Sequence, residues 1–333
     1  MSSLTKKAVI LGSGSWGTAL AIILSEHFTN VTIIGRCPYQ VAEICTKHTN
    51  THYLPDVALP QNICCTNELN EAQSADIIFF VVPTSATREI ALQLSNIGIP
   101  EHIPIISCAK GIEQGTGMRM SNIIHQTMPK NPIAVLSGPT HAEEVAQGLA
   151  TCCVVGSIDT KLASNLQKVL TNKHFRTYTS QDVAGMELGG ALKNVFAIAA
   201  GIAAGIGLGD NAIAALVTRG LAEMTRLGIA LGGQPETFMG LSGVGDLMTT
   251  CYSKHSRNNR VGMSLGKGLS LRQACDELGM VAEGVPNTRS IYEAARETEI
   301  DTPILDAVYH VLYEDKPARQ ALQELLTRNP KAE

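Results

Sequence analysis

The first half of the chain alternates short, nearly continuous apolar runs with polar stretches of helical character. The apolar runs lie at residues 8–11, 31–34, 75–82, 103–109, 133–137 and 151–156. A strand that is buried on both faces has such an unbroken apolar run, and strands that alternate with helices are typical of βαβ units. The pattern therefore predicts a parallel, doubly wound sheet with helices on its faces.

Beyond about residue 180 the strand-like runs almost vanish and helical stretches follow one another. We expect helices at about residues 182–208, 210–231, 246–252, 257–266, 270–278, 286–297, 303–314 and 317–327. Prolines near the joints, where helices begin or end, support these boundaries; they are Pro235, Pro286, Pro303 and Pro317. A chain of 333 residues suits two domains of roughly 100–200 residues each. We place an α/β domain at 1–182 and an all-α domain at 183–333.

One stretch of the second half, residues 195–208, is apolar throughout. It is only 14 residues long, whereas a membrane-spanning helix needs about 20. Lys193 and Asp210 stand near its two ends. We interpret it as a buried core helix and expect no integral membrane segment. Gly201 and Gly205 would let a neighbouring backbone approach closely, either within the chain or across a homodimer.

Charge and cysteine usage narrow the classes of protein further. The net charge is −4, so the chain as a whole does not attract nucleic acid or an acidic membrane. The nine cysteines are odd in number and lack the spacing of a disulfide framework or a zinc site, so we expect no metal centre. Reduced cysteines and the lack of a signal-peptide pattern predict a cytoplasmic protein.

A glycine-rich turn follows the first apolar run. Gly12, Gly14 and Gly17 fit the pattern G-x-G-x-x-G, with a strand before it, a helix after it and a second strand about 20 residues on, as in dinucleotide-binding folds. Gly12 would make the tight turn, Gly14 would let a pyrophosphate approach the backbone, and Gly17 would let the helix pack on the sheet. The helix N-terminus would offer free N–H groups to the phosphates. The first domain is therefore predicted to be of the Rossmann type.

The end of the second strand bears on the choice of cofactor. NAD-specific sites usually place Asp or Glu there, but this chain has Gly35 and Arg36. A guanidinium suits the 2′-phosphate of NADP, so the cofactor is NAD or NADP, with NADPH slightly favoured. Alternatively, Arg36 stacks on the adenine and does not discriminate.

Two further segments follow predicted strands. Lys110 directly follows the run 103–109, at the carboxyl edge that faces ligand in open α/β sheets, which favours a functional role; the alternative is a solvated loop lysine. Gly138 and Thr140 follow the next strand, and Thr140 with Glu143 fits a capping box. The cap alone would explain Thr140, so its role stays open at this point.

Candidate residues in the helical half begin with Lys193, at the edge of the most apolar helix. A lysine in such surroundings has a lowered pKa, which suits proton exchange near neutrality. The alternative is a lysine whose stem lies on apolar surface while its amine reaches water.

A polar segment further on carries a second group of candidates. Asp246 is either functional or an N-cap after a glycine turn. Ser256, Arg257 and Asn258 place a forked cation beside neutral donors, a combination that recognises phosphate; the alternative is a solvated basic loop.

Taken in order, these segments resemble a known family. They read GSGSWGTALA, CAKG, SGPTHAEE, ELGGALKNVFAIAAGI, GVGDL, HSRNNRVG and VAEGV. This order resembles NAD(P)-dependent glycerol-3-phosphate dehydrogenase of the bacterial type, over about residues 8–325. The lysine-asparagine helix followed by GDL and SRN is specific to this family. Where the family commonly has Asn beside Trp16, this chain has Ser15, which changes a side chain but not the backbone contact.

The resemblance implies a role for each candidate. The residues implied to contact the cofactor are those of the glycine-rich turn together with Ser15, Trp16, Arg36, Lys110, Ala142, Arg257, Val281 and Glu283. Contacts to sn-glycerol 3-phosphate fall to Lys110, Gly138, Thr140, Asp246, Ser256, Arg257 and Asn258. Lys193 would be the proton acceptor, and Lys110 would assist it in catalysis. The implied reaction interconverts glycerol 3-phosphate and dihydroxyacetone phosphate and would feed phospholipid synthesis.

The chemistry of that reaction suits these residues. When hydride reaches the ketone carbon, the oxygen becomes an alkoxide, which a protonated Lys193 can stabilise and then protonate. Lys110 would add a second cation and depress the pKa of Lys193. Arg257 and Asn258 would hold the remote phosphate and so orient the reacting carbon.

Two other classes of function stay open. One is another two-domain dehydrogenase, of the 6-phosphogluconate or ketopantoate reductase type, which also uses a lysine of the helical domain. The other is a dinucleotide sensor without turnover, which would have no use for the two lysines.

Overall fold

The computed structural model describes residues 6–329, which form two compact units. The first unit comprises the chain up to Ala109 together with Arg119–Val183, and the second comprises Lys110–Met118 together with the chain from Ala184 onward. Lys110 therefore belongs to the helical unit, although strands of the first unit precede and follow it in sequence.

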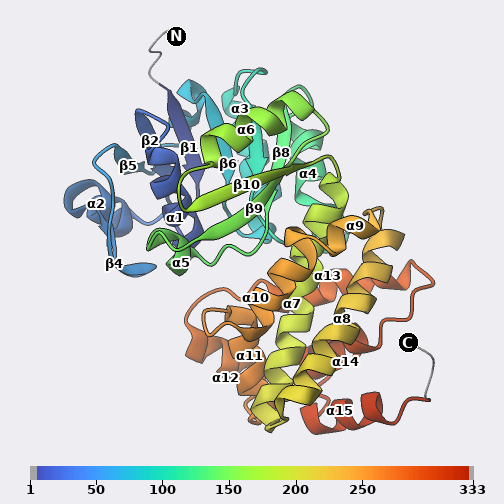
Figure 1. The fold of residues 1–333 in the computed structure, drawn as a ribbon. Helices are drawn as coiled ribbons and strands as arrows, with labels where there is room; N and C mark the ends of the chain where they lie inside the picture. The colour runs from blue at the N-terminus through green and yellow to red at the C-terminus, as the bar shows by residue number, and fades with distance from the viewer. Residues whose placement is uncertain (1–5, 330–333) are drawn as a thin grey trace. The chain divides into compact units, whose positions relative to one another are not determined.

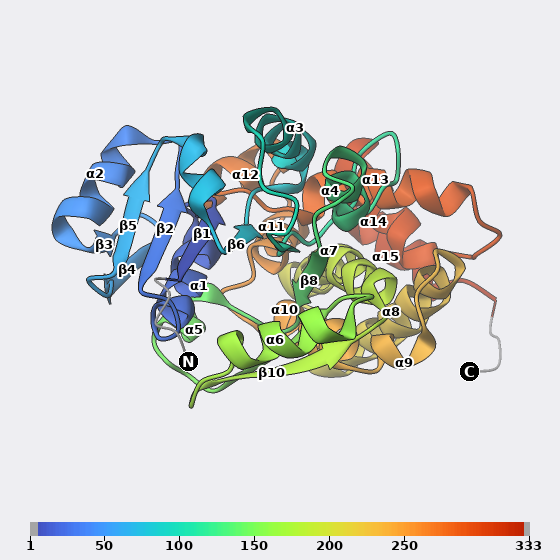
Figure 2. The same ribbon diagram turned by 90° about the horizontal axis from the view of Figure 1, so that it is seen from above.

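Within residues 6–329, the first unit has an eight-stranded sheet in the order β10-β9-β8-β7-β6-β1-β2-β5; Figure 2 shows one end of this order, from β6 through β1 and β2 to β5. The strands are β1 (Lys7–Leu11), β2 (Asn30–Ile34), β5 (Ile63–Thr66), β6 (Ile77–Phe80), β7 (Ile105–Ser107), β8 (Ile133–Ser137), β9 (Thr151–Gly156) and β10 (Phe175–Ser180). The predicted fold class, a doubly wound sheet followed by a helical domain, is confirmed.

One pair of strands departs from the prediction. β8 and β9 pair antiparallel, whereas every other neighbouring pair in this sheet is parallel. The helix between them, α5 (Ala142–Ala146), has five residues and rises only about 7.5 Å, less than the roughly 17 Å of a five-residue strand. The chain therefore does not return to the start of β8 before it enters β9. The longer α6 (Thr160–Leu170) does make that return, and β10 runs parallel to β9.

The strand pattern missed the two edge strands and a small hairpin. β5 and β10 lie at the ends of the sheet, where one side of the backbone is unpaired and polar side chains are tolerated. Buried and exposed side chains alternate through most of β10, so it has no unbroken apolar run. β3 (Thr49–Asn50) and β4 (Leu54–Ala58) form a separate antiparallel pair that is too short and polar to show a period.

The sheet is buried on both faces, as its apolar runs predict. Alternate residues of β1 enter different cores: Ala8 and Ile10 face one and Val9 and Leu11 the other. The first core includes α1 (Ser15–Ser25) and α6, and the second includes α3 (Thr87–Ile97) and α4 (Met120–Thr127). α2 (Pro38–Lys47) packs beside β5, and two short 3-10 helices, Leu69–Ser74 and Thr84–Ala86, complete the unit.

The second unit is helical, and its element boundaries agree with the predicted ones within two residues. Its helices are α7 (Val183–Ile206), α8 (Asp210–Ala230), α9 (Pro235–Phe238), α10 (Asp246–Tyr252), α11 (Arg257–Gly266), α12 (Leu271–Leu278), α13 (Gly284–Arg296), α14 (Pro303–Tyr313) and α15 (Ala318–Leu326). The sequence pattern missed only the one-turn α9 and the π-helical turn Leu241–Gly245, which are too short to show an apolar period.

Helix α7 forms the centre of this unit, with the other helices packed around it (Figure 1). By length and hydropathy it could cross a membrane, but 83% of its most apolar 18-residue window is buried within the protein. Its Gly201 and Gly205 face Gly262 and Gly266 of α11, and a Cβ at any of the four would overlap backbone of the other helix. The close approach expected at these glycines therefore occurs within the chain.

A buried carboxylate joins two of the helices that pack around α7. Glu223 of α8 is 1% exposed and accepts hydrogen bonds from the N–H groups of Ile304 and Leu305, at 3.1 and 2.9 Å. These N–H groups belong to the first turn of α14, whose N-cap residue Thr302 makes no side-chain cap. Glu223 thus caps α14 from a neighbouring helix.

Replacing Glu223 with alanine is expected to lower the free energy of unfolding by about 2–4 kcal/mol, because two buried N–H groups lose their acceptor. Equilibrium unfolding in denaturant measures this change. Glu299→Ala, which removes an exposed carboxylate of the same unit, is the control and should change stability by no more than about 0.5 kcal/mol. Equal effects of the two substitutions would contradict the capping role.

The same carboxyl group also makes stability depend on pH. Burial raises the pKa of Glu223 from 4.5 to about 7, although the two N–H donors oppose the rise. Because the folded state then binds the proton more tightly than the unfolded state, the stability from this group is complete below about pH 4.5 and is lost as the pH rises toward 7. Glu223→Gln should remove this part of the pH dependence.

Candidate active site

The glycine-rich turn of the first unit has the geometry that a dinucleotide requires. Gly12 has a φ of +114°, and a Cβ there would overlap the carbonyl of Val81. A Cβ on Gly17 would overlap the carbonyl of Gly12, so α1 can pack this closely only with glycine. A Cβ on Gly14, in contrast, meets nothing within 4 Å. The side of the loop at Gly14 is therefore open, directly before the N-terminus of α1, and these residues fit a bound pyrophosphate.

The other residues predicted to contact the cofactor in this unit surround that loop. Ser15 is buried and its hydroxyl donates to the carbonyl of Tyr53 at 3.2 Å, while Trp16 is half-buried. Arg36 is exposed, and a Cβ on Gly35 beside it would overlap the hydroxyl of Ser13. An exposed arginine at this position suits contact with the ribose end of a dinucleotide.

The predicted capping box at Thr140 is wrong. α5 begins at Ala142 with His141 as its N-cap residue, and no side-chain cap bond forms. The hydroxyl of Thr140 instead donates to the carbonyl of Gly138 at 3.2 Å, because Gly138 has a φ of +132° and turns the chain sharply after β8. Gly138 and Ala142 are buried. Their contacts with substrate and cofactor stay predictions.

The second unit brings three predicted residues into direct contact. The carboxylate of Asp246 accepts from the Nζ of Lys110 at 2.7 Å and, through its other oxygen, from the Nζ of Lys193. Lys193 also donates to the hydroxyl of Thr250 at 2.6 Å, and that hydroxyl donates to the carbonyl of Asp246 at 2.6 Å. The side chains of Asp246 and Lys193 are 3% and 7% exposed, against 22% for Lys110. Lys193 therefore does not extend its amine to water.

Burial and charge act together on these groups. Burial lowers the pKa of Lys193 to about 8; Asp246 opposes this shift, and Lys110 lowers the pKa further. Burial would raise the pKa of Asp246, but Lys110 and Lys193 outweigh it and hold that pKa below its ordinary value. With both amines protonated, the three groups carry a net charge of +1, which suits an oxygen that becomes negative during reaction.

The backbone of Lys110 is held by two carboxamides of the same unit. Its carbonyl accepts from Asn194 of α7 at 3.2 Å and from Asn287 of α13 at 2.8 Å. Asn194 in turn accepts from Asn258 at 2.8 Å, and Asn258 accepts from the N–H of Gly284 at 2.9 Å. This chain of amides joins α7, α11 and α13 to the residue that begins the segment Lys110–Met118.

Around the start of α11 lie the residues predicted to bind phosphate. Ser256 is the N-cap and accepts from the N–H of Asn259. Arg257 is exposed and donates to the carbonyl of Val281 at 2.9 Å. Glu283, two residues after Val281, is half-buried and lies directly before α13. Asn258 is buried within the amide chain rather than open to solvent. Contacts of these residues with substrate and cofactor stay predictions.

Sequence reasoning missed three residues of this arrangement: Thr250, Asn194 and Asn287. Thr250 lies four residues after Asp246 on α10, so an i, i+4 search from a candidate acid would have found it. Asn194 directly follows Lys193 at the edge of the apolar stretch, but nothing in the local sequence indicates its distant partners Lys110 and Asn258. No local signal marks Asn287, because its partner is 177 residues away.

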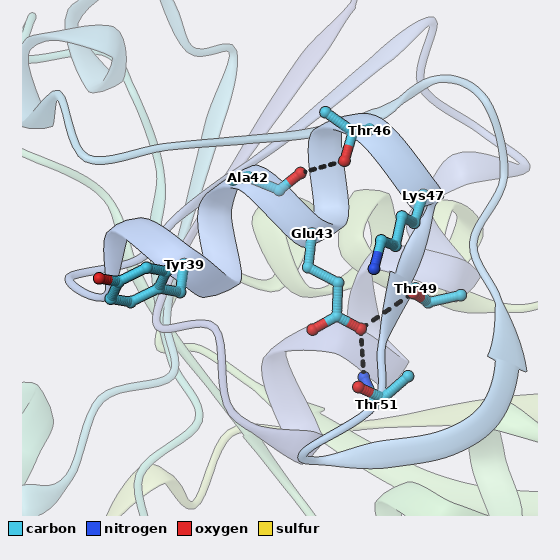
Figure 3. Close-up of a pocket in the computed structure, with 7 residues that line it drawn as sticks. All are labelled: Tyr39, Ala42, Glu43, Thr46, Lys47, Thr49 and Thr51. Carbon is cyan, nitrogen blue, oxygen red and sulfur yellow. Dashed lines mark hydrogen bonds between the residues drawn. The ribbon is translucent and has the colours of Figure 1, made fainter.

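The first unit also has a pocket away from the glycine-rich turn, and its lining is mainly polar. It has a volume of about 360 Å³ and lies between α2 and β3, lined by Tyr39, Ala42, Glu43, Thr46, Lys47, Thr49 and Thr51 (Figure 3). The carboxylate of Glu43 is engaged there by Thr49 and by the N–H of Thr51. Among residues 6–329, no group of three or more His, Cys, Asp and Glu side chains is placed to hold a metal ion.

Comparison with known proteins agrees with this site. The models of the NAD-dependent glycerol-3-phosphate dehydrogenase N-terminus and C-terminus match residues 7–163 and 182–323. A curated relative, the NAD(P)+ glycerol-3-phosphate dehydrogenase of Enterococcus faecalis, is 47% identical over 332 residues, which cover 98% of this chain and 97% of that protein. The chain belongs to the NAD-dependent glycerol-3-phosphate dehydrogenase family. The predicted family is confirmed, and the protein is an NAD(P)-dependent oxidoreductase.

Solved structures support the fold at two levels of similarity. The crystal structure of glycerol-3-phosphate dehydrogenase from Coxiella burnetii is 36% identical and has a TM-score of 0.93, covering 97% of this chain and 99% of that one. A ketopantoate reductase from Ralstonia eutropha has a TM-score of 0.61 at 14% identity over 95% of this chain and 99% of that one. The second likeness shows a shared fold alone.

Proposed function

We propose that Lys193 is the proton acceptor and donor of this dehydrogenase, with Asp246 and Lys110 as its charged partners. The enzyme interconverts sn-glycerol 3-phosphate and dihydroxyacetone phosphate with NAD or NADP. The observation that carries the proposal is the buried group Lys110–Asp246–Lys193, which combines one carboxylate with two amines.

The protonation of Lys193 changes with the direction of the reaction. During reduction of the ketone, its ammonium donates a proton to the oxygen on C2 as that oxygen becomes negative, and Lys110 adds a second positive charge. During oxidation, the neutral amine of Lys193 accepts the hydroxyl proton. A pKa of about 8 lets both forms be populated near neutrality. Bound NAD(P)H supplies the hydride for C2, and the reaction otherwise relies on these side chains.

Arg257 is proposed to hold the phosphate of the substrate. Its guanidinium is exposed at the first turn of α11 and uses one Nη1 hydrogen bond on the carbonyl of Val281, which leaves further donors of the fork for an anion. A phosphate held there is remote from C2, so its binding energy orients the carbon that reacts. Ser256, Asn258, Gly138 and Thr140 are proposed as further substrate contacts.

We propose a division of labour between the two parts of the chain. Residues 1–182 bind the dinucleotide through Gly12, Gly14, Ser15, Trp16 and Gly17. Residues 183–333, together with Lys110, Gly138 and Thr140, bind and convert the substrate. Arg36 is proposed to favour the 2′-phosphate of NADPH, because a guanidinium and no carboxylate stands beside Gly35.

The remaining proposals concern the cell. Reduction of dihydroxyacetone phosphate in the cytoplasm would supply glycerol 3-phosphate for phospholipid synthesis. A homodimer also stays a proposal, and the glycines that suggested it face α11 of the same chain.

Initial-rate kinetics with dihydroxyacetone phosphate and each reduced cofactor tests the function directly. We expect turnover with both cofactors and a higher kcat/KM with NADPH. Turnover only with ketopantoate or 6-phosphogluconate would instead favour another two-domain dehydrogenase. Binding of cofactor with no turnover on any of these compounds would favour a dinucleotide sensor.

Arg257→Ala is expected to raise the KM for dihydroxyacetone phosphate by about 100-fold, because a charge-assisted hydrogen bond to the phosphate is lost. Stability should change little, since Arg257 is exposed. Arg260→Ala, one turn further along α11 and also exposed, is the matched control and should keep the KM of the unmodified enzyme. An unchanged KM in Arg257→Ala would exclude it as the phosphate contact.

A further inference from the structure

The glycine-rich loop is held from outside by two carboxamides that belong to neither the loop nor α1. Asn50, on β3, is fully buried. Its Nδ2 donates to the carbonyl of Ser13 at 2.9 Å and to the hydroxyl of Thr18 at 2.7 Å. Its Oδ1 accepts from the Nε2 of Gln40 at 2.9 Å.

Gln40, on α2, holds the same loop residue at two points. Its Nε2 donates to the carbonyl of Ser13 and its Oε1 accepts from the hydroxyl of Ser13, each at 2.6 Å. The carbonyl of Ser13 therefore accepts two hydrogen bonds, which use both of its lone pairs. The hydroxyl of Thr18 continues the network by donating to the carbonyl of Gly14 at 2.9 Å.

From these bonds we infer that Asn50, with Gln40, is a positioning residue for the pyrophosphate of the cofactor. The C=O and N–H of one trans peptide point in opposite directions. When the carbonyl of Ser13 points at Asn50 and Gln40, the N–H of Gly14 in the same peptide must point away from them. Nothing lies within 4 Å of the Cβ position of Gly14, so the loop is open at the residue that carries this N–H.

The physical benefit is that the loop is ordered before the cofactor binds. Glycine has more backbone freedom than any other residue type. If Gly14 lost that freedom only when the cofactor bound, the affinity for the cofactor would be weaker. The carboxamides fix it in advance, without a charge that would repel or attract phosphate. This inference rests on the proposed binding of NAD(P) by the loop.

The residues on either side of Asn50 are bound to Glu43, as Figure 3 shows for Thr49 and Thr51. The hydroxyl of Thr49 and the backbone N–H of Thr51, on either side of Asn50, donate to the same carboxylate oxygen of Glu43 on α2, at 2.9 and 2.8 Å. The N–H of Thr51 is the main cause that holds the pKa of Glu43 below its ordinary value. Successive side chains of a strand point to opposite faces, so with the side chain of Thr49 bound to Glu43, the side chain of Asn50, next in β3, is directed to the loop.

The test compares three variants by cofactor affinity and by kinetics. Asn50→Leu removes both hydrogen-bond donors and keeps the number and branching of the side-chain heavy atoms. Gln40→Met removes the second carboxamide at a half-buried position, where folding is less at risk. Asn62→Leu is the matched control, because the Nδ2 of Asn62 also donates two hydrogen bonds, here to the carbonyls of Ser25 and Phe28, but at the opposite end of α1.

The binding assay titrates NADPH and follows energy transfer from Trp16, which is the single tryptophan of the chain and lies beside the loop. We expect the Kd to rise about 10-fold in Asn50→Leu and in Gln40→Met and to stay unchanged in Asn62→Leu. At saturating NADPH, kcat and the KM for dihydroxyacetone phosphate should stay within about twofold of the unmodified enzyme.

A merely structural role would give a different result. Lower melting temperatures in all three variants with an unchanged Kd would overturn the inference, and so would a Kd that rises equally in Asn62→Leu. If the unmodified protein binds NADPH but does not reduce dihydroxyacetone phosphate, the proposed function fails, while the Kd values still decide the role of Asn50.

Discussion

Lys193→Ala is expected to lower kcat by about 10³–10⁴-fold and to change the KM for dihydroxyacetone phosphate only modestly. The substitution removes both the proton that reaches the oxygen on C2 and the charge that stabilises that oxygen beforehand, and general acid–base catalysis alone is worth about 10²–10⁴-fold. Steady-state rates at saturating substrate and cofactor measure the loss. Lys254→Ala, which removes an exposed lysine after α10, is the control and should keep full activity.

The pH profile distinguishes proton transfer from simple positioning. Burial sets the pKa of Lys193 near 8. Reduction needs the protonated amine, so its rate should fall as the pH rises through about 8; oxidation needs the neutral amine, so its rate should rise over the same interval. Lys193→Ala should lose both inflections. A variant with near-normal turnover, or with an unchanged pH profile, would exclude Lys193 as the proton donor and acceptor.

Asp246→Asn is expected to have the second largest effect, and it should act on stability and catalysis together. The substitution leaves two amines with no carboxylate at a site where Asp246 is 2% exposed, and breaking a buried ion pair from one side costs about 3–5 kcal/mol. It should also lower the pKa of Lys193 further, because the charge that raises it is removed. Reduction should then slow by about 100-fold at neutral pH, where less of Lys193 is protonated.

Two measurements separate these effects. Denaturant unfolding gives the change in the free energy of unfolding, and the pH profile of reduction should shift to lower pH. Asp301→Asn is the matched control, since it breaks a pair with Arg328 in which both side chains are about half exposed, and surface pairs contribute only about 0–1 kcal/mol. If Asp246→Asn kept both stability and the pH inflection near 8, Asp246 would not be the partner that sets the charge of Lys193.

The two substitutions also test different parts of one arrangement. Lys193→Ala removes the group that exchanges the proton, whereas Asp246→Asn keeps that group and changes its surroundings. Lys110 links them, because it contacts the second oxygen of Asp246 and lowers the pKa of Lys193 without contacting it through a hydrogen bond. A catalytic loss in Asp246→Asn that high substrate does not restore would indicate that charge, not binding, is affected.

Local patterns in the sequence were sufficient for most of the elements and for the type of chemistry. Strands buried on both faces have unbroken apolar runs, and helices have their own period, so βαβ alternation and the later helices could be predicted from neighbouring residues alone. The glycines at 12, 14 and 17 predicted a dinucleotide loop for the same reason. Lys193 was a candidate because a lysine beside fourteen apolar residues is a local feature.

Local patterns could not predict the contacts between residues that are distant in sequence, because these contacts depend on how the chain packs. Lys110 and Asp246 are 136 residues apart, and Asn50 lies 37 residues from Ser13; nothing near either residue indicates its partner. The antiparallel β8–β9 pair follows from the shortness of α5, which the alternation of apolar and polar runs does not reveal. A buried charge or amide must be satisfied by whichever group the fold brings within about 3 Å, so which groups meet is a property of the folded chain, while the ability to form a helix, strand or turn is a property of each segment.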